Sequence, residues 1–300
     1  MTRLSGPVWW EFAVRGVTLR GTAQGRGADR APEAAAVVAV HGGPGVDGGG
    51  LRQVLAPLAE QAELVVPDLR GHGRSDRADP ATWTLDDWAD DLAGVIDALQ
   101  LHRPVVVGVS FGGWVALRYA ARHREQLGSL VIAATTARLP SVEEGAERMA
   151  SLGGPASAAA WRAVHADPSF EASPAFERHV LALMAVQPPS AELRTVRAAQ
   201  IRTPEVNEHF TPQFSRLDLT SDARRTRCPV AVVVGERDPL TTAQLAAATA
   251  DACPGPTRLR LIPDAAHDLL SDAPNVLLEE IAWALAARDR HGQQDTAVSR

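Results

Sequence analysis

Lysine is absent from this sequence of 300 residues, in which all 30 basic residues are arginine. This absence excludes Schiff-base catalysis by a lysine, and it excludes a phosphate-binding loop of the P-loop type, which requires one. Runs of positive charge are also lacking, and the net charge is −6. We therefore expect no nucleic acid among the partners of this protein.

Cysteine and long apolar runs are also scarce. The two cysteines, Cys228 and Cys253, form no C-x-x-C pair and predict no disulfide framework. Cys228 leads into a strand-like run, which favours a buried apolar role over a reactive thiol. No run approaches the roughly 18 apolar residues of a membrane span. The stretch "MTRLSGPVWWEF" has no apolar core of signal-peptide length. We expect a soluble, cytoplasmic protein and no membrane among its partners.

Strand-like and helix-like segments alternate along most of the chain. Residues 8–24 predict a hairpin that turns at Arg15-Gly16. The later apolar runs are mostly continuous, as in a parallel sheet covered on both faces. These runs are 35–41, 63–67, 104–109, 129–134, 229–235 and 258–262, and the helical patterns between and after them include 84–101, 112–123 and 275–288. The pattern predicts an α/β protein with a mostly parallel central sheet and helices on both faces.

The alternation is interrupted once. Residues 137–224 contain no clear buried strand, only Ala- and Glu-rich helical segments separated by proline and glycine. An insertion of helices into a parallel α/β sheet is the simplest account. The sequence therefore predicts a core formed by residues 1–136 and 225–300, with a helical cap at 137–224. Residues 289–300 are polar, and we expect a frayed tail there.

The strongest local signal is "VVVGVSFGGWVALRYA", residues 105–120. It contains G-x-S-x-G, with Ser110 at its centre, directly after an apolar strand and directly before a helical pattern. Strand, sharp turn and helix form the context that a nucleophile elbow requires. The glycines permit a tight turn that exposes the serine hydroxyl, and the helix N-terminus favours nearby negative charge. Ser110 is the predicted nucleophile.

A catalytic serine needs a base and an acid that orients the base. His267 follows the last strand-like run, and Asp238 ends the run before it, 29 residues earlier. This order, serine, then acid, then histidine, is the one that an elbow of this kind predicts. Glu236 is an alternative acid, although two residues earlier it points elsewhere. Asp264 and Asp268 are closer to His267 in sequence and are expected to shape its loop.

The glycine-rich loop "HGGPG", residues 41–45, follows the first parallel strand. A tetrahedral acyl intermediate needs two hydrogen-bond donors at its oxyanion. The backbone N–H of Phe111, directly after the nucleophile, is one candidate. A glycine in this loop supplies the other, with Gly43 preferred and Gly42 second.

The same loop allows a different interpretation. Residues 43–48 also spell G-x-G-x-x-G, and Asp68 follows 20 residues after Gly48, as in a dinucleotide-binding fingerprint. That hypothesis leaves Ser110, Asp238 and His267 unexplained. Pro44 and the extra glycines 49 and 50 also fit poorly with a helix that begins on a pyrophosphate.

Taken together, these motifs resemble the α/β-hydrolase superfamily, over about 1–136 and 225–288. "HGGPG" is similar to the proline iminopeptidase branch, and "DLRGHGRSD", residues 68–76, is similar to a segment after the second parallel strand in many of these enzymes. The resemblance implies the α/β-hydrolase fold, the triad Ser110, Asp238 and His267, and an oxyanion hole at Gly43 and Phe111. It also makes Gly43–Pro44 a candidate cis bond.

The sequence departs from that branch in two places. Proline iminopeptidases typically show GGSWG at the elbow, whereas this chain has GVSFG, residues 108–112. They also anchor the substrate amine on cap glutamates, and no glutamate here aligns with that role. The candidates, each of which also fits a solvated helix face, are Glu143, Glu144, Glu192, Glu205 and Glu208.

The sequence thus predicts a serine hydrolase that cleaves a small-molecule ester, lactone or amide through an acyl-enzyme on Ser110, without metal or organic cofactor. The alternatives are a proline iminopeptidase-type aminopeptidase and a non-hydrolytic or C–C bond-cleaving enzyme of the same fold. The expected partner is a small-molecule or short peptide substrate, and a homo-oligomer is compatible with the sequence. In the cap, Trp161 and Phe210 are candidate substrate contacts. The alternative for each is ordinary packing against other hydrophobic side chains.

Overall fold

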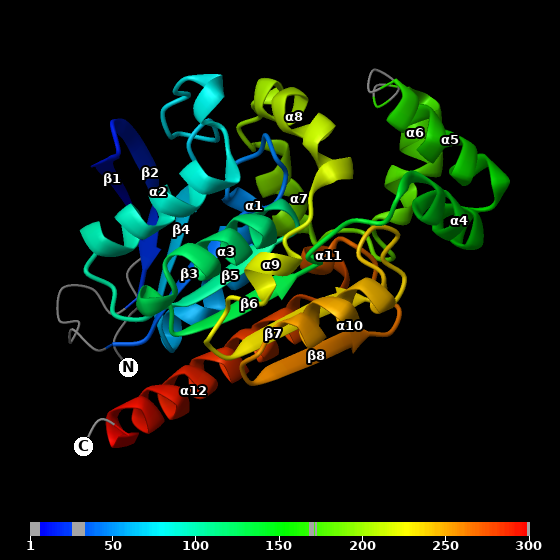
Figure 1. The fold of residues 1–300 in the computed structure, drawn as a ribbon. Helices are drawn as coiled ribbons and strands as arrows, with labels where there is room; N and C mark the ends of the chain where they lie inside the picture. Colours follow the sequence, from blue (N-terminus) through cyan, green and yellow to red (C-terminus); the bar gives the residue numbers. More distant parts are fainter. Residues whose placement is uncertain (1–6, 26–33, 168–170, 172, 299–300) are drawn as a thin grey trace.

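The computed structural model describes residues 7–25, 34–167, 171 and 173–298. Its centre is one eight-stranded sheet with the strand order β1-β2-β4-β3-β5-β6-β7-β8 (Figure 1). The first two strands form the predicted hairpin and pair antiparallel, β2 pairs antiparallel with β4, and the remaining neighbours are parallel. The strands are β1 (Val8–Val14), β2 (Val17–Gln24), β3 (Ala36–Val40), β4 (Glu63–Asp68), β5 (Val105–Val109), β6 (Ser129–Ala133), β7 (Val230–Gly235) and β8 (Thr257–Ile262).

Helices follow the parallel strands at the positions that the sequence predicts. In α2, the hydroxyl of Thr84 accepts a hydrogen bond from the N–H of Asp87 and caps the helix. The last helix continues through residues 289–298, so the expectation of a frayed tail there is wrong for the described part. The core helices are α1 (Gly49–Leu55), α2 (Leu85–Ala98), α3 (Phe111–Arg122), α10 (Ala243–Ala252), α11 (Leu269–Asp272) and α12 (Pro274–Val298).

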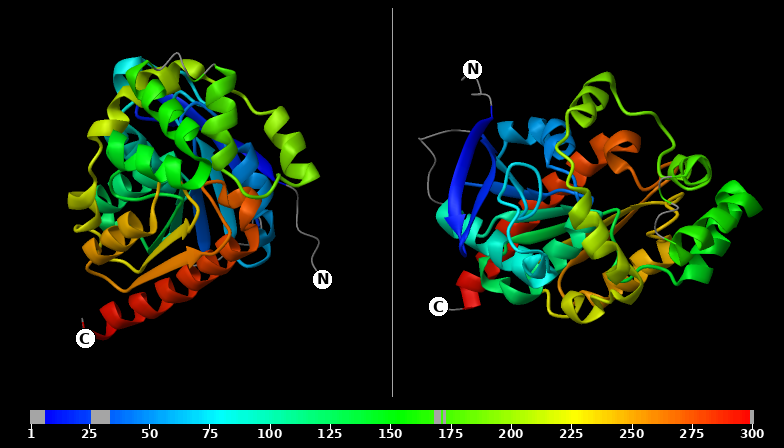
Figure 2. Two further views of the ribbon diagram at one scale, coloured as in Figure 1. Left: turned by 90° about the vertical axis from the view of Figure 1, so that its right-hand side faces the viewer. Right: turned by 90° about the horizontal axis from the view of Figure 1, so that it is seen from above.

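The chain between β6 and β7 contains helices and no named strand in its described part, as the sequence predicts. These helices are α4 (Val142–Gly153), α5 (Pro155–Ala166), α6 (Pro174–His179), α7 (Ala191–Ala198), α8 (Pro204–Phe210) and the short α9 (Thr220–Ala223). The first five form two groups in space: α4, α5 and α6 stand to one side with a small apolar cluster of their own, and α7 and α8 lie nearer the sheet (Figures 1 and 2). Of the second group, α7 packs against the core helix α1.

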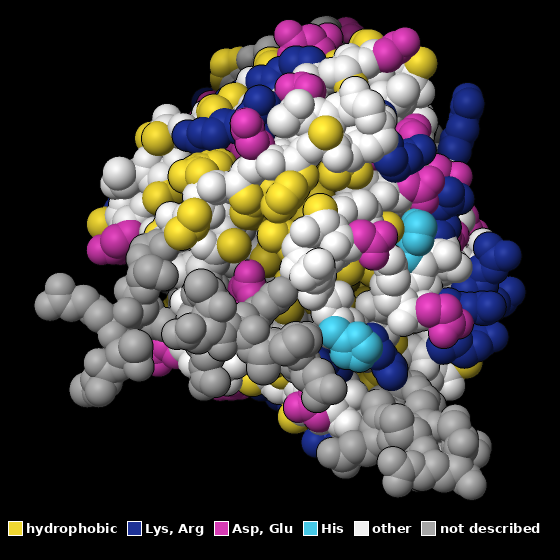
Figure 3. Space-filling model, turned by 90° about the vertical axis from the view of Figure 1, so that its left-hand side faces the viewer, with side chains coloured by type: hydrophobic (Ala, Val, Ile, Leu, Met, Phe, Trp, Pro, Cys, Tyr) yellow, Lys and Arg dark blue, Asp and Glu magenta, His cyan; other side chains and the backbone are white. Residues whose placement is uncertain are grey.

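The hairpin strand β1 forms one edge of the sheet. Its side chains Val8 and Trp9 are large hydrophobic groups that remain 61% and 47% exposed. Hydrophobic side chains gather in the middle of the face seen from this side of the molecule, with charged groups around them (Figure 3). The guanidinium groups of Arg52 and Arg74 lie 5.0 and 4.3 Å from the ring centroid of Trp9, so this indole makes cation–π contacts with both arginines.

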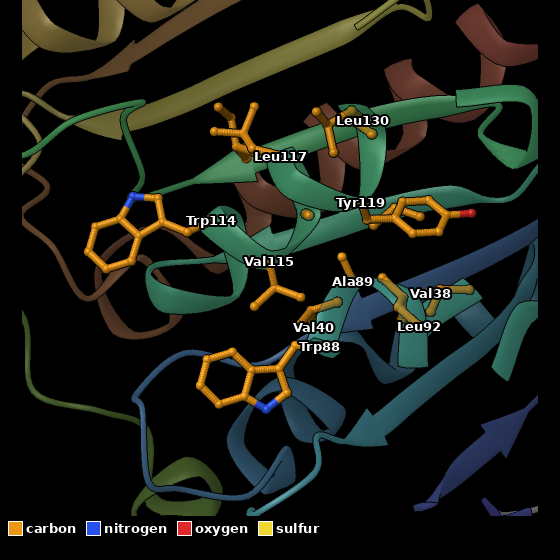
Figure 4. Close-up of a cluster of buried hydrophobic side chains, with 14 of the residues drawn as sticks. Val38, Val40, Trp88, Ala89, Leu92, Trp114, Val115, Leu117, Tyr119 and Leu130 are labelled. Atoms are coloured by element: carbon orange, nitrogen blue, oxygen red, sulfur yellow. The ribbon is translucent and has the colours of Figure 1, made fainter. Parts of the chain in front are cut away.

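Side chains alternate between two hydrophobic cores, one on each face of the sheet. Val106 of β5 faces the core that includes α2 and α3, whereas Val105 and Val107 face the core that includes α1 and α12. Figure 4 shows the first core, in which residues of α2 and α3 meet Val38 and Val40 of β3. Burial on both faces explains why the strand sequences read as continuous apolar runs.

Candidate active site

Ser110 lies between the end of β5 and the first residue of α3, at the carboxyl edge of the parallel strands. Its backbone has φ 53° and ψ −121°, a conformation that costs a non-glycine residue roughly 1–3 kcal/mol. Neighbouring groups hold it there: the N–H of Ser110 donates to the carbonyl of Ala133 at 2.8 Å, and the hydroxyl of Thr135 donates to the carbonyl of Ser110 at 2.8 Å. The elbow is thus anchored to the next strand and its loop.

Glycine is required on both sides of the elbow. A Cβ at Gly108 would collide with the backbone of Gly112 and Gly113, in the first turn of α3. A Cβ at Gly112 would collide with the carbonyl oxygens of Val40 and His41. The helix therefore packs against its own strand and against β3 at distances that exclude any side chain, which fixes the direction of the turn.

The structure brings Ser110, His267 and Asp238 together. Ser110 Oγ lies 2.9 Å from His267 Nε2, and His267 Nδ1 lies 2.9 Å from Asp238 Oδ2. The three side chains come from the loops after β5, β8 and β7. His267 keeps 17% of its side-chain surface exposed and Asp238 none. The side chains thus form one continuous hydrogen-bonded chain with the serine at its outer end.

The environment of Asp238 favours its charged form. Oδ1 accepts the N–H groups of Leu240 at 2.7 Å and Thr241 at 2.9 Å, while the Thr241 hydroxyl donates to Oδ2. Burial would raise the pKa of this carboxyl, but the charge and hydrogen bond of His267 and the bonds from Thr241 lower the pKa overall. Glu236, the alternative acid, is exposed, and its hydrogen bonds are made by its backbone: its carbonyl accepts from Arg148, and its N–H donates to the carbonyl of Ile262.

Asp238 acts in turn on the histidine. Burial works to lower the pKa of His267, but the charge of Asp238 and its hydrogen bond to Nδ1 outweigh it and raise the pKa above the ordinary 6.5. A hydrogen bond from Nδ1–H to Asp238 leaves the lone pair of Nε2 directed at the serine hydroxyl. This is the tautomer that a general base requires.

The loop at residues 41–45 passes directly beside the serine. The Gly43–Pro44 bond is cis. A Cβ built on Gly42 would lie 3.4 Å from the Cβ of Ser110, so the backbone of the loop is adjacent to the nucleophile. The N–H of Phe111 is the first of α3, where no intrahelical partner exists. These positions fit the predicted donors Gly43 and Phe111, with Gly42 as the adjacent alternative.

His41 orients the peptide between Gly42 and Gly43. Its Nδ1–H donates to the carbonyl of Gly42 at 2.9 Å, and its Nε2 accepts the N–H of Leu69 at 3.3 Å. Burial is the main cause that lowers the pKa of His41, which keeps the ring neutral and able to accept. In a trans peptide the N–H of Gly43 points opposite to the carbonyl of Gly42. It is therefore directed away from His41.

Asp68 has a structural role that conflicts with the dinucleotide interpretation. The carboxylate is fully buried, and its Oδ1 accepts the N–H of Gly48 and a guanidinium N–H of Arg52, both at 3.0 Å. Its Oδ2 accepts the N–H of Arg74 at 3.0 Å. These bonds fasten the glycine loop to the "DLRGHGRSD" turn. No oxygen of Asp68 is exposed to meet a ribose.

The two candidate substrate contacts lie in packed surroundings. Trp161 of α5 is 8% exposed, and its indole N–H donates to the carbonyl of Val142 at 3.0 Å. Phe210 of α8 is 1% exposed, with its ring centroid 5.2 Å from that of Phe111. Phe210 therefore supports Phe111 from behind, while Trp161 holds α4 and α5 together.

Sequence reasoning missed several residues that hold the site. Thr241 binds the proposed acid, Asp238, and His41 binds the carbonyl of Gly42 in the glycine loop. Glu171 forms a side-chain hydrogen bond with Asn207 of α8. A polar residue three positions after Asp238 was the available signal for Thr241. For Glu171 there was none, because it stands alone in a segment without periodicity. Of the five glutamates considered, Glu143 pairs with Arg162 at 2.6 Å.

Within the described residues, no group of three or more histidine, cysteine, aspartate or glutamate side chains is arranged to hold a metal ion. In the same part of the chain, no helix combines the length and the apolar character needed to cross a membrane.

Comparison with known proteins identifies the family. The model of the alpha/beta hydrolase fold matches residues 35–274. The chain therefore belongs to the α/β-hydrolase family, as the sequence motifs predict.

Among its relatives, the pimeloyl-[acyl-carrier protein] methyl ester esterase of Chromobacterium violaceum is 35% identical over 220 residues, which are 68% of this chain and 76% of that protein. The 2-hydroxymuconate semialdehyde hydrolase of Pseudomonas sp. (strain CF600) is 41% identical over 95 residues, 31% of this chain, and the match spans only 34% of that protein.

Solved structures give the same fold. Proline iminopeptidase from Mycobacterium smegmatis has a TM-score of 0.76 at 20% identity, with 95% of this chain and 100% of that chain covered. This likeness concerns the fold alone. The proline iminopeptidase-related protein from Thermus thermophilus has a TM-score of 0.73 at 26% identity, with 94% and 98% covered.

Proposed function

We propose that this protein hydrolyses an acyl bond in a small-molecule ester, lactone or amide through an acyl-enzyme on Ser110. The observation that carries the proposal is the chain of two 2.9 Å contacts from Ser110 Oγ through His267 to Asp238. The strained elbow and the adjacent glycine loop support it, because they supply an exposed hydroxyl and backbone donors at one place.

In the proposed reaction, Ser110 Oγ attacks the carbonyl carbon while its proton passes to His267 Nε2. The N–H groups of Gly43 and Phe111 stabilise the resulting oxyanion, each being worth roughly 100- to 1000-fold in rate. The tetrahedral intermediate collapses as His267 returns the proton to the leaving group. Water then attacks the carbonyl carbon of the acyl-enzyme by the same two steps, which releases the carboxylic acid and restores the free serine. Asp238 stabilises the imidazolium in both halves.

We also propose that residues 137–224 act as a cap over a core of 1–136 and 225–300. Helices α4 to α8 all fall inside this range, and several of their residues bind the loops that carry the triad. Arg148 of α4, for example, donates to the backbone carbonyls of Glu236 and Asp238, at 2.5 and 3.3 Å. In this role the cap selects the substrate.

A second candidate activity is removal of an N-terminal residue such as proline. Glu171 favours it, because this carboxylate comes from the segment between α5 and α6 and hydrogen-bonds Asn207 of α8. A Cβ built on Gly45 would lie 3.4 Å from the Cβ of Asn207, so the partner of Glu171 borders the glycine loop. A carboxylate in that position is suited to bind a substrate ammonium group.

A substrate panel tests both activities. It contains p-nitrophenyl esters of rising acyl length, lactones and prolyl arylamides. Turnover of esters or lactones that is lost in Ser110→Ala supports the first proposal, and no turnover of any member contradicts it. If prolyl arylamides are cleaved, Glu171→Gln should raise their KM and leave ester hydrolysis unchanged. Glu177→Gln, which alters another glutamate, on α6, is the matched control.

A further inference from the structure

The chain from the last turn of α7 to the start of α8 reaches both halves of the proposed active site. In that last turn, Arg197 forms a two-pronged ion pair with Asp268, with Nη1–Oδ2 and Nη2–Oδ1 distances of 2.7 Å each. Asp268 directly follows His267. The hydroxyl of Ser271 donates to Asp268 Oδ2 at 2.6 Å and completes its hydrogen bonding. A guanidinium fork matched to a carboxylate fixes orientation as well as distance.

The same segment binds the glycine loop only four to six residues later. The N–H of Asp47 donates to the carbonyl of Ile201 at 3.2 Å, and the N–H of Ile201 donates to Asp47 Oδ2 at 3.0 Å. The N–H of Thr203 donates to the carbonyl of Gly45 at 2.8 Å. One short stretch of backbone therefore links the histidine loop to the loop that carries the proposed oxyanion donor.

The histidine loop is also held from its other side. Asp272 accepts the N–H groups of Val186 at 2.9 Å and of Gln187 at 2.7 Å with Oδ1, and that of Ala266 at 2.7 Å with Oδ2. The N–H of Asp268 donates to the carbonyl of Met184 at 2.7 Å. Asp268 and Asp272, which follow His267, are thus bonded to inserted residues, and Asp272 also binds Ala266, which precedes His267.

We propose that residues 197–203 form a brace that sets the histidine loop against the glycine loop, with Arg197 as a positioning residue for His267 through Asp268. The inference rests on the proposed hydrolase function. Because the brace belongs to the insertion, the geometry of the triad depends on the cap being in place. Misplacement of a reacting group by about 1 Å can cost roughly 100-fold in rate.

The brace also has an electrostatic effect on His267. The charged groups that face this imidazole are Asp238 from the loop after β7 and Asp268 beside it, while the neutral Ser110 faces it from the elbow. Both carboxylates raise the pKa of His267, and Arg197 neutralises one of them. Loss of Arg197 should therefore raise the pKa of His267 further, and loss of the Asp268 charge should lower it.

The test uses the full chain and four variants: Arg197→Gln, Arg197→Lys, Asp268→Asn and, as a control, Arg194→Gln, an exposed arginine on the same helix. The rate of inactivation by a fluorophosphonate is measured for each, and the titration of the His267 imidazole is followed by NMR. We expect Arg197→Gln to slow inactivation roughly 10- to 100-fold. Arg197→Lys should keep the pKa of His267 near the wild-type value while losing part of the rate, because ammonium lacks the fork.

Opposite shifts in the pKa of His267, upward in Arg197→Gln and downward in Asp268→Asn, are the signature that a purely structural role would not produce. Unchanged inactivation in Arg197→Gln, an equal loss in Arg194→Gln, or shifts in the same direction would overturn the proposal. If Arg197→Gln does not fold, Arg197→Lys and Asp268→Asn decide. The titration needs no substrate, so it tests the brace even if wild-type Ser110 proves unreactive, which would refute the hydrolase proposal instead.

Discussion

Replacement of Asp238 by asparagine should remove most of the activity without removing much of the structure. The two oxygens of this carboxylate are not equivalent. Oδ1 accepts two backbone N–H groups, from Leu240 and Thr241, and Oδ2 faces His267 Nδ1 and the Thr241 hydroxyl. The carbonyl oxygen of an asparagine must therefore take the Oδ1 position, because an amide NH₂ there would oppose two donors. The NH₂ group then faces the histidine.

That orientation reverses the histidine tautomer. Nδ1 must accept from the amide, so the proton moves to Nε2 and the lone pair that would deprotonate Ser110 is lost. A change of tautomer of this kind costs about 10⁴-fold in kcat, which corresponds to about 5 kcal/mol in the activation barrier. Hydrolysis of p-nitrophenyl acetate and the rate of fluorophosphonate inactivation should both fall by this order.

Glu236→Gln is the matched control, since it changes a carboxylate two residues away that is exposed and does not contact His267. It should retain wild-type rates. Circular dichroism and the urea midpoint should show that Asp238→Asn is folded. Retention of more than a tenth of the activity in Asp238→Asn, or a comparable loss in Glu236→Gln, would refute the assignment of the acid.

Two further predictions concern pH and stability. The pKa of His267 in the folded protein lies above the ordinary 6.5, and His267 must be neutral to act as the base. The value of kcat/KM should therefore rise with pH through an apparent pKa above 6.5. A rise centred below pH 6.5 would contradict this. Arg70 and Asp91 form a buried ion pair with an N–O distance of 2.6 Å. Asp91→Ala leaves the guanidinium of Arg70 buried without this partner and should lower the free energy of unfolding, measured with urea, by about 3–5 kcal/mol. A loss below about 1 kcal/mol would show that the pair is not needed for stability.

Much of the fold and the proposed triad could be predicted because they depend on local signals. Each buried strand is a continuous apolar run, and the turn at Ser110 needs glycines on both sides, which leaves a visible motif. Asp238 and His267 follow strand ends, where a parallel sheet gathers functional groups at one edge. Their positions in the chain were therefore informative even without any knowledge of distances.

The inserted helices could not be resolved in the same way. Their apolar residues pack at helical spacing whether they face a substrate or one another, so the sequence could not show that Trp161 and Phe210 pack internally. The attachments of the cap are single polar contacts between distant segments, such as Arg197 with Asp268. An arginine on a helix shows no sequence pattern that distinguishes a surface charge from such a contact.

Labelling of Ser110 tests the central claim most directly. Wild-type protein is treated with a fluorophosphonate, and the product is analysed by intact mass and peptide mapping. The proposed mechanism predicts one adduct per chain, located on Ser110, with activity lost in proportion to labelling and no adduct in Ser110→Ala. An active protein that is not labelled, or that is labelled at another residue, would contradict it.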